Sequence, residues 1–440
     1  MSSRIASVVV ALLTACAACG DDDGPASSPD SGPGADVAPP PPPPDSGPID
    51  GAGLDAGGPE PTDAPTKGPW VLRPTTTSVL VRWESVLAPD EVAVEYEPIS
   101  GGAPATATGT ARETVVTLGF GVDSRLVPEP DVPGTYFIDE VEIGGLEPAT
   151  CYRYRVVGYE DEAHGRFCTM HAPTDHTTPI ELFVIGDTNP SIGNTAGVLE
   201  HGELDVAELT LHLGDIQYYS SVIESWQSWF GLMEPLLRAG ALMPTIGNHE
   251  DELDGELEDY YVRLFGGASE DGDEHRYHFE SGGVHFFSLD SEGELGAGSE
   301  QATWLEAELA EAEASDGYRF SILYCHRPPY SVGGSSGSRS VRSALAPVVA
   351  AHTVPLVMSG HVHNYQRFDV DGVAYVVSGG GGGLLETVEP QPDQMEDAAL
   401  RVAAGSYYHA IRLTIDETTI HGDVVDDAGD VRDSFDYPVP

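Results

Sequence analysis

Five short apolar runs beyond residue 180 are each followed directly by polar residues that can bind metals. The runs occupy residues 182–185, 209–213, 242–246, 320–325 and 355–358. Their length and their lack of a helical period predict buried strands. The polar blocks after them occupy residues 186–189, 214–218, 247–250, 326–330 and 359–364. Because open α/β sheets build their sites at the carboxyl ends of strands, we expect one α/β domain in which these blocks share a site.

Helical and turn patterns complete this domain. Apolar residues recur at helical spacing over residues 226–237, which predicts a helix packed on the core, and residues 301–312 predict a half-buried helix. Residues 410–415 and 418–421 predict a terminal hairpin. The glycine run 379–383 lacks the Lys and Ser/Thr of a phosphate-binding loop, so we expect it to be a turn that approaches its neighbours closely.

Short alternating runs between Trp70 and Thr169 predict a β domain. They occupy residues 78–83, 91–96, 115–118 and 152–156, without a helical period. Strands at this spacing over roughly a hundred residues are typical of a sandwich. The segment from Leu146 to Tyr152 resembles the Leu-x-Pro-x-x-x-Tyr corner of fibronectin type III domains, and Trp83 takes the position of their core tryptophan. This resemblance implies a fibronectin III-like sandwich over residues 69–172.

The cysteines allow one bridge in this β domain. Cys151 and Cys168 bracket a hairpin that is predicted to turn near residues 160–163, so an oxidising compartment permits a cross-strand disulfide. Two free buried thiols are the alternative. Cys325 lies inside an apolar run, and we expect it to pack in the core rather than to react.

The N-terminus resembles a bacterial lipoprotein signal peptide. Arg4 supplies a positive charge, and residues 5–15 are apolar but too few to span a bilayer. The run ends in Leu-Thr-Ala-Cys16, so Cys16 is the expected lipidated residue. Cys19 is a second candidate, and an ordinary signal peptide cut near Ala18 is the alternative.

The resulting organisation is a lipoprotein signal peptide over residues 1–19 and a Pro/Asp-rich linker over residues 20–68. The linker holds almost nothing to bury, so we expect it to be disordered and to act as a tether or as a passive spacer. The chain would then be an exported bacterial lipoprotein of the periplasm or cell surface. Its membrane contact would come only through the N-terminal lipid anchor.

Charge excludes one class of partner. The chain has 72 acidic and 20 basic residues, which gives a formal net charge of −52. Binding to nucleic acid or to an anionic membrane surface needs clustered Lys and Arg. We therefore expect no nucleic acid as a structural partner.

The polar blocks contain Asp, Asn, His and Tyr without a thiolate. This set of oxygen and nitrogen ligands suits Fe, Mn, Zn or Mg. One carboxylate can bridge two metals about 3.5–4 Å apart, as in two-metal hydrolytic sites. A tyrosine normally ionises near pH 10, so Tyr218 as a phenolate ligand would require a strongly Lewis-acidic ion such as trivalent iron.

This constellation resembles the calcineurin-like metallophosphoesterases, and within them the purple acid phosphatases, over roughly residues 175–437. The resemblance implies an αββα sandwich over residues 173–440 and a dinuclear centre of Fe(III) with Zn, Fe or Mn. Asp215 would bridge the ions, and His249 would not ligate but would act as general acid or electrostatic stabiliser. The implied metal ligands are Asp187, Tyr218 and His363 for the first ion, Asn248, His326 and His361 for the second, and Asp215 for both.

The function implied by this resemblance is an exported, acid phosphatase-like enzyme that hydrolyses phosphate monoesters by means of a metal-bound hydroxide. Its partner would be a small phosphorylated substrate. A phosphodiesterase or nucleotidase that uses the same site is the alternative. A surface binding lipoprotein with a vestigial metal domain is a second alternative.

One feature of the sequence favours the purple type, and another departs from the pattern of its plant-type members. Other branches place a histidine where this chain has Asn189, and Tyr218 fills that vacancy, which favours the purple type. Plant-type members have a substrate-holding His pair shortly after the fourth block, whereas residues 331–343 contain no histidine. Arg339 or Arg342 is the predicted substitute. The missing pair puts monoester preference and an acid optimum in doubt.

Overall fold

The structure is a computed structural model that describes residues 65–116, 134–159, 164–190, 193–218, 226–250, 256–266 and 274–440. All of them belong to one compact unit, Gly58–Pro440. The predicted signal peptide and most of the predicted linker lie outside the described residues. So do the end of the predicted strand 115–118 and the predicted turn 160–163. No helix within the described ranges is long and apolar enough to cross a membrane.

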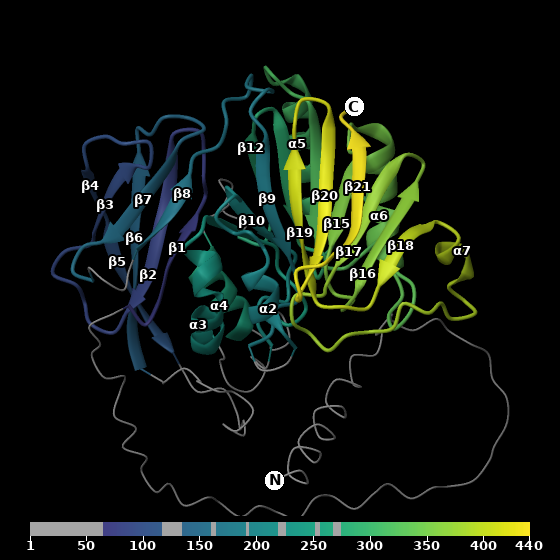
Figure 1. Cartoon of the computed structure of the whole chain (residues 1–440), viewed down its shortest axis with the longest axis horizontal. Coiled ribbons are helices and arrows are strands. Elements are labelled where there is room, and N and C mark those ends of the chain that lie inside the picture. The colour runs from purple at the N-terminus through teal and green to yellow at the C-terminus, as the bar shows by residue number, and fades with distance from the viewer. Residues whose placement is uncertain are drawn as a thin grey trace, which may run out of the picture. The chain divides into compact units, whose positions relative to one another are not determined.

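The C-terminal part is built on two sheets (Figure 1). The first contains the parallel strands β9 (Ile180–Ile185), β10 (Leu209–His212) and β11 (Ala241–Pro244) and continues into antiparallel β19 (His409–Ile415), β20 (Thr419–Asp426) and β21 (Val431–Pro438). The second runs in the order β12 (Tyr277–Ser281), β13 (Val284–Leu289), β14 (Phe320–Cys325), β15 (Leu356–Ser359), β17 (Val373–Ser378), β16 (Tyr365–Val370) and β18 (Arg401–Gly405). The predicted terminal hairpin is confirmed as β19 and β20.

Apolar packing arranges these elements in four layers. The two sheets share one core, to which Val184 and Ile322 belong. The outer face of the first sheet is covered by α2 (Thr195–Glu200), α3 (Trp226–Leu237) and α4 (Glu256–Phe265). The outer face of the second sheet is covered by α5 (Glu300–Ala314) and α6 (Arg339–Ala351), while the short α7 (Met395–Ala398) lies before β18. The αββα prediction and the two predicted helices, now α3 and α5, are confirmed.

The N-terminal part is a β-sandwich, as predicted. One sheet contains β1 (Lys67–Leu72), β2 (Ser78–Ser85), β6 (Gly134–Gly144) and β5 (Thr110–Val116), and the other contains β4 (Ala105–Thr108), β3 (Ala93–Pro98), β7 (Cys151–Val156) and β8 (His164–Cys168). Trp83 is buried between them. The Glu147 N–H donates to Tyr152 Oη at 3.0 Å, which is the expected tyrosine corner. Cys151 and Cys168 are opposite each other on β7 and β8 and form a disulfide, and Cys325 is a free buried thiol.

The sandwich is not a separate body, which the sequence did not predict. β1 pairs in parallel with β11 through Val71 and Ala241, so one ten-stranded sheet runs through both domains. Trp70 Nε1 donates to the Leu264 carbonyl at 3.1 Å and Arg82 Nη1 donates to the same carbonyl at 2.7 Å. These bonds join β1 and β2 to α4, so the sandwich supports the first sheet from its side.

Candidate metal centre

The five predicted strands end where the sequence places the polar blocks. β9, β10 and β11 deliver the first three blocks from one sheet, and β14 and β15 deliver the last two from the other. The site is therefore assembled from both sheets at their carboxyl ends, as expected for an α/β fold.

Three of the predicted ligands have backbones in the left-handed region. The φ angles are 59° at Asp187, 47° at Asp215 and 68° at His361. Residues other than glycine rarely adopt this region, and where they do the cost is about 1–3 kcal/mol. The sharp turns after β9, β10 and β15 thus aim the three side chains at a cost that the surrounding packing must offset.

One group of ligand atoms comes from Asp187, Asp215 and His363. One atom of each lies within 4.8 Å of the others. The Tyr218 hydroxyl joins them, at 2.7 Å from His363 Nε2, 3.2 Å from Asp215 Oδ2 and 3.3 Å from Asp187 Oδ1. These four residues are the predicted ligands of the first metal.

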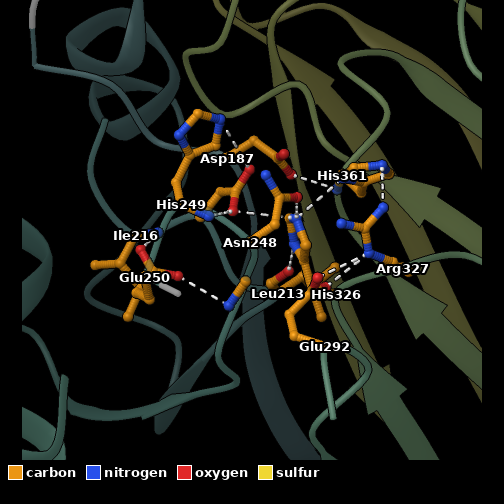
Figure 2. Close-up of polar contacts among 12 residues, drawn as sticks. Asp187, Leu213, Ile216, Asn248, His249, Glu250, Glu292, His326, Arg327 and His361 are labelled. Carbon is orange, nitrogen blue, oxygen red and sulfur yellow. Dashed lines mark hydrogen bonds and ion pairs between the residues drawn. The ribbon is translucent and has the colours of Figure 1, made fainter. Parts of the chain in front are cut away.

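A second group of ligand atoms comes from Asp215, His326 and His361. Figure 2 shows His326 and His361 beside Asn248. His326 Nε2 lies 3.1 Å from Asp215 Oδ1, 3.1 Å from Asn248 Oδ1 and 3.2 Å from His361 Nδ1. These four residues are the predicted ligands of the second metal. Asp215 belongs to both groups, as a bridging carboxylate must.

Backbone carbonyls fix two of the histidine rings. His326 Nδ1 lies 2.9 Å from the Leu213 carbonyl, and His363 Nδ1 lies 2.9 Å from the Leu384 carbonyl. Because a carbonyl only accepts, each Nδ1 donates, and when the ring is neutral each Nε2 presents a lone pair to its group. Histidines that bind metals are commonly held in this way.

The electrostatics of the buried groups favour cations. Burial raises the pKa of Asp187. Burial acts in the same sense on Asp215, yet the charges of His326 and His249 hold the pKa of that carboxyl well below its usual range. Burial, together with Asp215 and Asp187, raises the pKa of Tyr218 well above 10. A phenolate at this position therefore requires a positive charge that the side chains do not supply.

His249 lies beside both groups without joining either. Its backbone N–H donates to Asp215 Oδ1 at 3.0 Å, while its ring Nε2 is 3.9 Å from Asp215 Oδ2. The ring packs on Tyr218 at 4.2 Å between centroids, and the side chain is 15% exposed. A histidine in this position can reach a ligand that enters from solvent.

Glycines allow the close approach that the run 379–383 predicts. A Cβ on Gly383 would lie 2.6 Å from His363 Cε1, and a Cβ on Gly379 would lie 2.9 Å from Asp187 Oδ2. Gly383 N–H also donates to the Asp187 carbonyl at 2.9 Å. The run is thus a wall of the site, and side chains there would displace two ligands.

Residues that support the site were missed from the sequence. Glu250 is fully buried and accepts from the Ile216 and Gly247 N–H groups at 2.8 Å each, which ties the second block to the third. Its place directly after Asn248 and His249 was a signal for such a role. The end of β13 was missed as a sixth block: Ser291 Oγ accepts from the Arg327 N–H at 2.8 Å, and Glu292 binds the Arg327 side chain.

The structure contradicts the predicted substitutes for the missing histidine pair. The Arg342 guanidinium donates from Nη1 to Asp397 Oδ1 at 3.0 Å and packs over the Tyr330 ring at 4.0 Å. Arg339 is exposed at the first turn of α6. Arg342 is therefore bound to α7, and Arg339 lies at the exposed start of α6. The prediction that one of them replaces the histidine pair was wrong, because both belong to a surface helix.

Comparisons with known proteins place the chain by its two parts. The family profile described as calcineurin-like phosphoesterase matches residues 180–365, and the profile described as purple acid phosphatase, N-terminal domain, matches residues 69–173. Purple acid phosphatase 22 of Arabidopsis thaliana is 29% identical over 59% of this chain and 63% of its own length. Purple acid phosphatase 21 of the same plant is 30% identical over 56% and 60%. The chain thus spans about three fifths of each plant relative.

Two solved structures share the fold. The purple acid phosphatase from yellow lupin (Lupinus luteus) seeds has a TM-score of 0.65 at 20% identity and covers 84% of this chain and 74% of its own. The structure of PhoD has a TM-score of 0.58 at 15% identity and covers 87% and 92%.

Proposed function

We propose that this chain, which contains a purple acid phosphatase N-terminal domain followed by a calcineurin-like phosphoesterase domain, hydrolyses phosphate monoesters at a dinuclear metal centre. One observation carries the proposal: two groups of ligand atoms, each within 4.8 Å, share the Asp215 carboxylate. The relatives named purple acid phosphatase support the reaction class.

The donor set fits such a centre. Carboxylate, amide, imidazole and phenol groups converge without a thiolate, and the Nδ1–carbonyl bonds of His326 and His363 turn each Nε2 toward its ligand group. Asp187, Asp215, Tyr218 and His363 would hold iron(III), and Asp215, Asn248, His326 and His361 would hold zinc, iron or manganese. When bound, the pair would supply Lewis acidity toward phosphoryl oxygens and lower the pKa of water.

The residues of the chain have three tasks in this scheme. Asp215, which belongs to both ligand groups, would hold both cations. The carbonyls of Leu213 and Leu384 keep His326 and His363 in the ligating tautomer. His249, partly exposed beside Asp215, would donate a proton to the leaving alkoxide oxygen of the ester.

The retained ligands also weigh against a vestigial site. All seven predicted ligands converge, and three of them pay the strain of a left-handed backbone. Strained backbones of this kind cluster at active sites. Diester or nucleotide hydrolysis at the same site remains the second candidate, since the chain lacks the histidine pair of plant-type members in residues 331–343.

Purified protein is expected to contain about two metal ions, to cleave an aryl phosphate faster than the matching diester, and to absorb visible light through Tyr218 and iron. Metal analysis, initial rates and an absorption spectrum measure these properties. A stable protein with neither metal nor turnover would support the binding-protein alternative.

The matched variant is Tyr218→Phe. It removes one oxygen from a buried ring and is expected to bleach the visible band while the protein still binds metal. An iron-loaded wild type without such a band would exclude the phenolate ligand.

We further propose that the protein is exported as a lipoprotein anchored at Cys16 or Cys19. The Cys151–Cys168 disulfide supports an oxidising compartment. Mass spectrometry of the N-terminal peptide from membranes of the source organism is expected to find a diacylglycerol-modified cysteine. An unmodified N-terminus that begins after Ala18 would favour ordinary secretion.

A further inference from the structure

Arg327 lies against the second group of ligands. Its Nη1 is 3.3 Å from His361 Nε2, on the ring edge opposite the Nδ1 that faces His326 (Figure 2). The side chain is 34% exposed, so the guanidinium stands between a predicted ligand and solvent.

A carboxylate from the neighbouring strand holds this guanidinium in place. Glu292, which follows β13 and is 9% exposed, accepts from Arg327 Nε at 2.8 and 3.0 Å. Ser291 Oγ accepts from the backbone N–H of Arg327. Both bonds to Glu292 use Nε, so the two Nη groups keep their four hydrogens for other partners.

Metal binding would change the contact between Arg327 and His361. With its Nδ1 lone pair on a cation, a neutral imidazole carries its proton on Nε2. Nε2 and Nη1 would then both be donors and could not form a hydrogen bond. The Nη groups would therefore turn to an acceptor that enters from solvent, while Glu292 keeps Nε at the rim.

A phosphate ester is an acceptor of the right kind. A guanidinium binds two phosphate oxygens side by side, with charge-assisted bonds stronger than neutral ones. The chain has a net charge of −52, so an anion gains from a local cation at the entrance. The segment 331–343 lacks histidine, and Arg342 is bound to Asp397. Another residue must therefore bind the phosphate group.

We propose that Arg327, positioned by Glu292, binds the non-reacting phosphoryl oxygens of the substrate and gives the site a preference for dianionic monoesters over monoanionic diesters. The inference rests on the proposed function and deepens it. A doubly charged phosphoryl group interacts more strongly with the guanidinium than a singly charged one, because the Coulomb energy scales with the charge.

The test compares metal-loaded wild type with Arg327→Gln. Calorimetry with inorganic phosphate is expected to give a dissociation constant that is about tenfold or more higher in the variant, with metal content unchanged. The ratio of kcat/KM for an aryl monoester to that for the aryl diester is expected to fall by a similar factor. Arg327→Lys is expected to recover part of both losses.

Arg342→Gln is the matched control, because it removes a guanidinium that lies in the same region but is bound to Asp397. It is expected to leave phosphate binding and the ratio unchanged. Equal phosphate affinity in Arg327→Gln and wild type would overturn the inference alone. So would loss of metal from Arg327→Gln, which would make Arg327 a support of His361. A wild type that takes up no metal would overturn the proposed function as well.

Discussion

Replacing Asp215 with asparagine is expected to abolish turnover and to lower the metal content below that of the wild type. The carboxylate is 1% exposed, belongs to both ligand groups, and remains anionic because its pKa lies well below the usual range. Asparagine keeps the shape but removes the charge that would neutralise two cations. Loss of a residue that only hydrogen-bonds to a metal ligand lowers metal affinity or activity roughly 10–100-fold, and loss of the shared ligand itself should lower them further.

Metal analysis together with rates on an aryl phosphate measures this effect. Asp205→Asn, an exposed change of the same kind, is the control and should behave as wild type. Full activity with two metals in Asp215→Asn would refute the bridging role.

The elements that the sequence predicted best are those with a local pattern. The apolar runs became β9, β10, β11, β14 and β15 because fully buried strands must be apolar on both faces. The helix over residues 226–237 was predictable because its buried tryptophans recur at helical spacing.

Pairing between distant segments had no such pattern. Lys67 was assigned to the linker because that segment holds almost nothing to bury, yet β1 begins there and joins β11 through one pair, Val71 and Ala241. No local periodicity specifies which sheet edge a short strand will meet. The continuous sheet is therefore a property of the tertiary structure.

The same distinction holds within the site. The ligands stand in recognisable blocks, so their convergence could be anticipated from strand order. The groups that hold them are backbone atoms or single side chains from elsewhere, such as the Leu384 carbonyl for His363 and Glu292 for Arg327. Which of many carbonyls or glutamates lies within bonding distance depends on the packing of the two sheets.

Glu84→Ala is expected to lower the free energy of unfolding by about 3–5 kcal/mol, the cost of removing one member of a buried ion pair. Glu84 is fully buried on β2 and holds two cations: Lys67 Nζ at 2.6 Å from Oε1 and Arg263 Nη2 at 3.0 Å from Oε2. Lys67 belongs to β1 and Arg263 to α4, so this carboxylate neutralises the junction between the sandwich and the helix layer. Urea unfolding followed by tryptophan fluorescence measures the change.

Glu95→Ala is the matched control. Glu95 pairs with Arg155 at 2.6 Å, but both side chains are well exposed, at 38% and 45%. Exposed pairs contribute only about 0–1 kcal/mol because water screens them. A loss in Glu84→Ala no larger than in the control would mean that the junction does not depend on this carboxylate. If Glu84→Ala loses much of its free energy of unfolding but the folded protein keeps its metal content, Glu84 stabilises the sheet without affecting the metal centre at its strand ends.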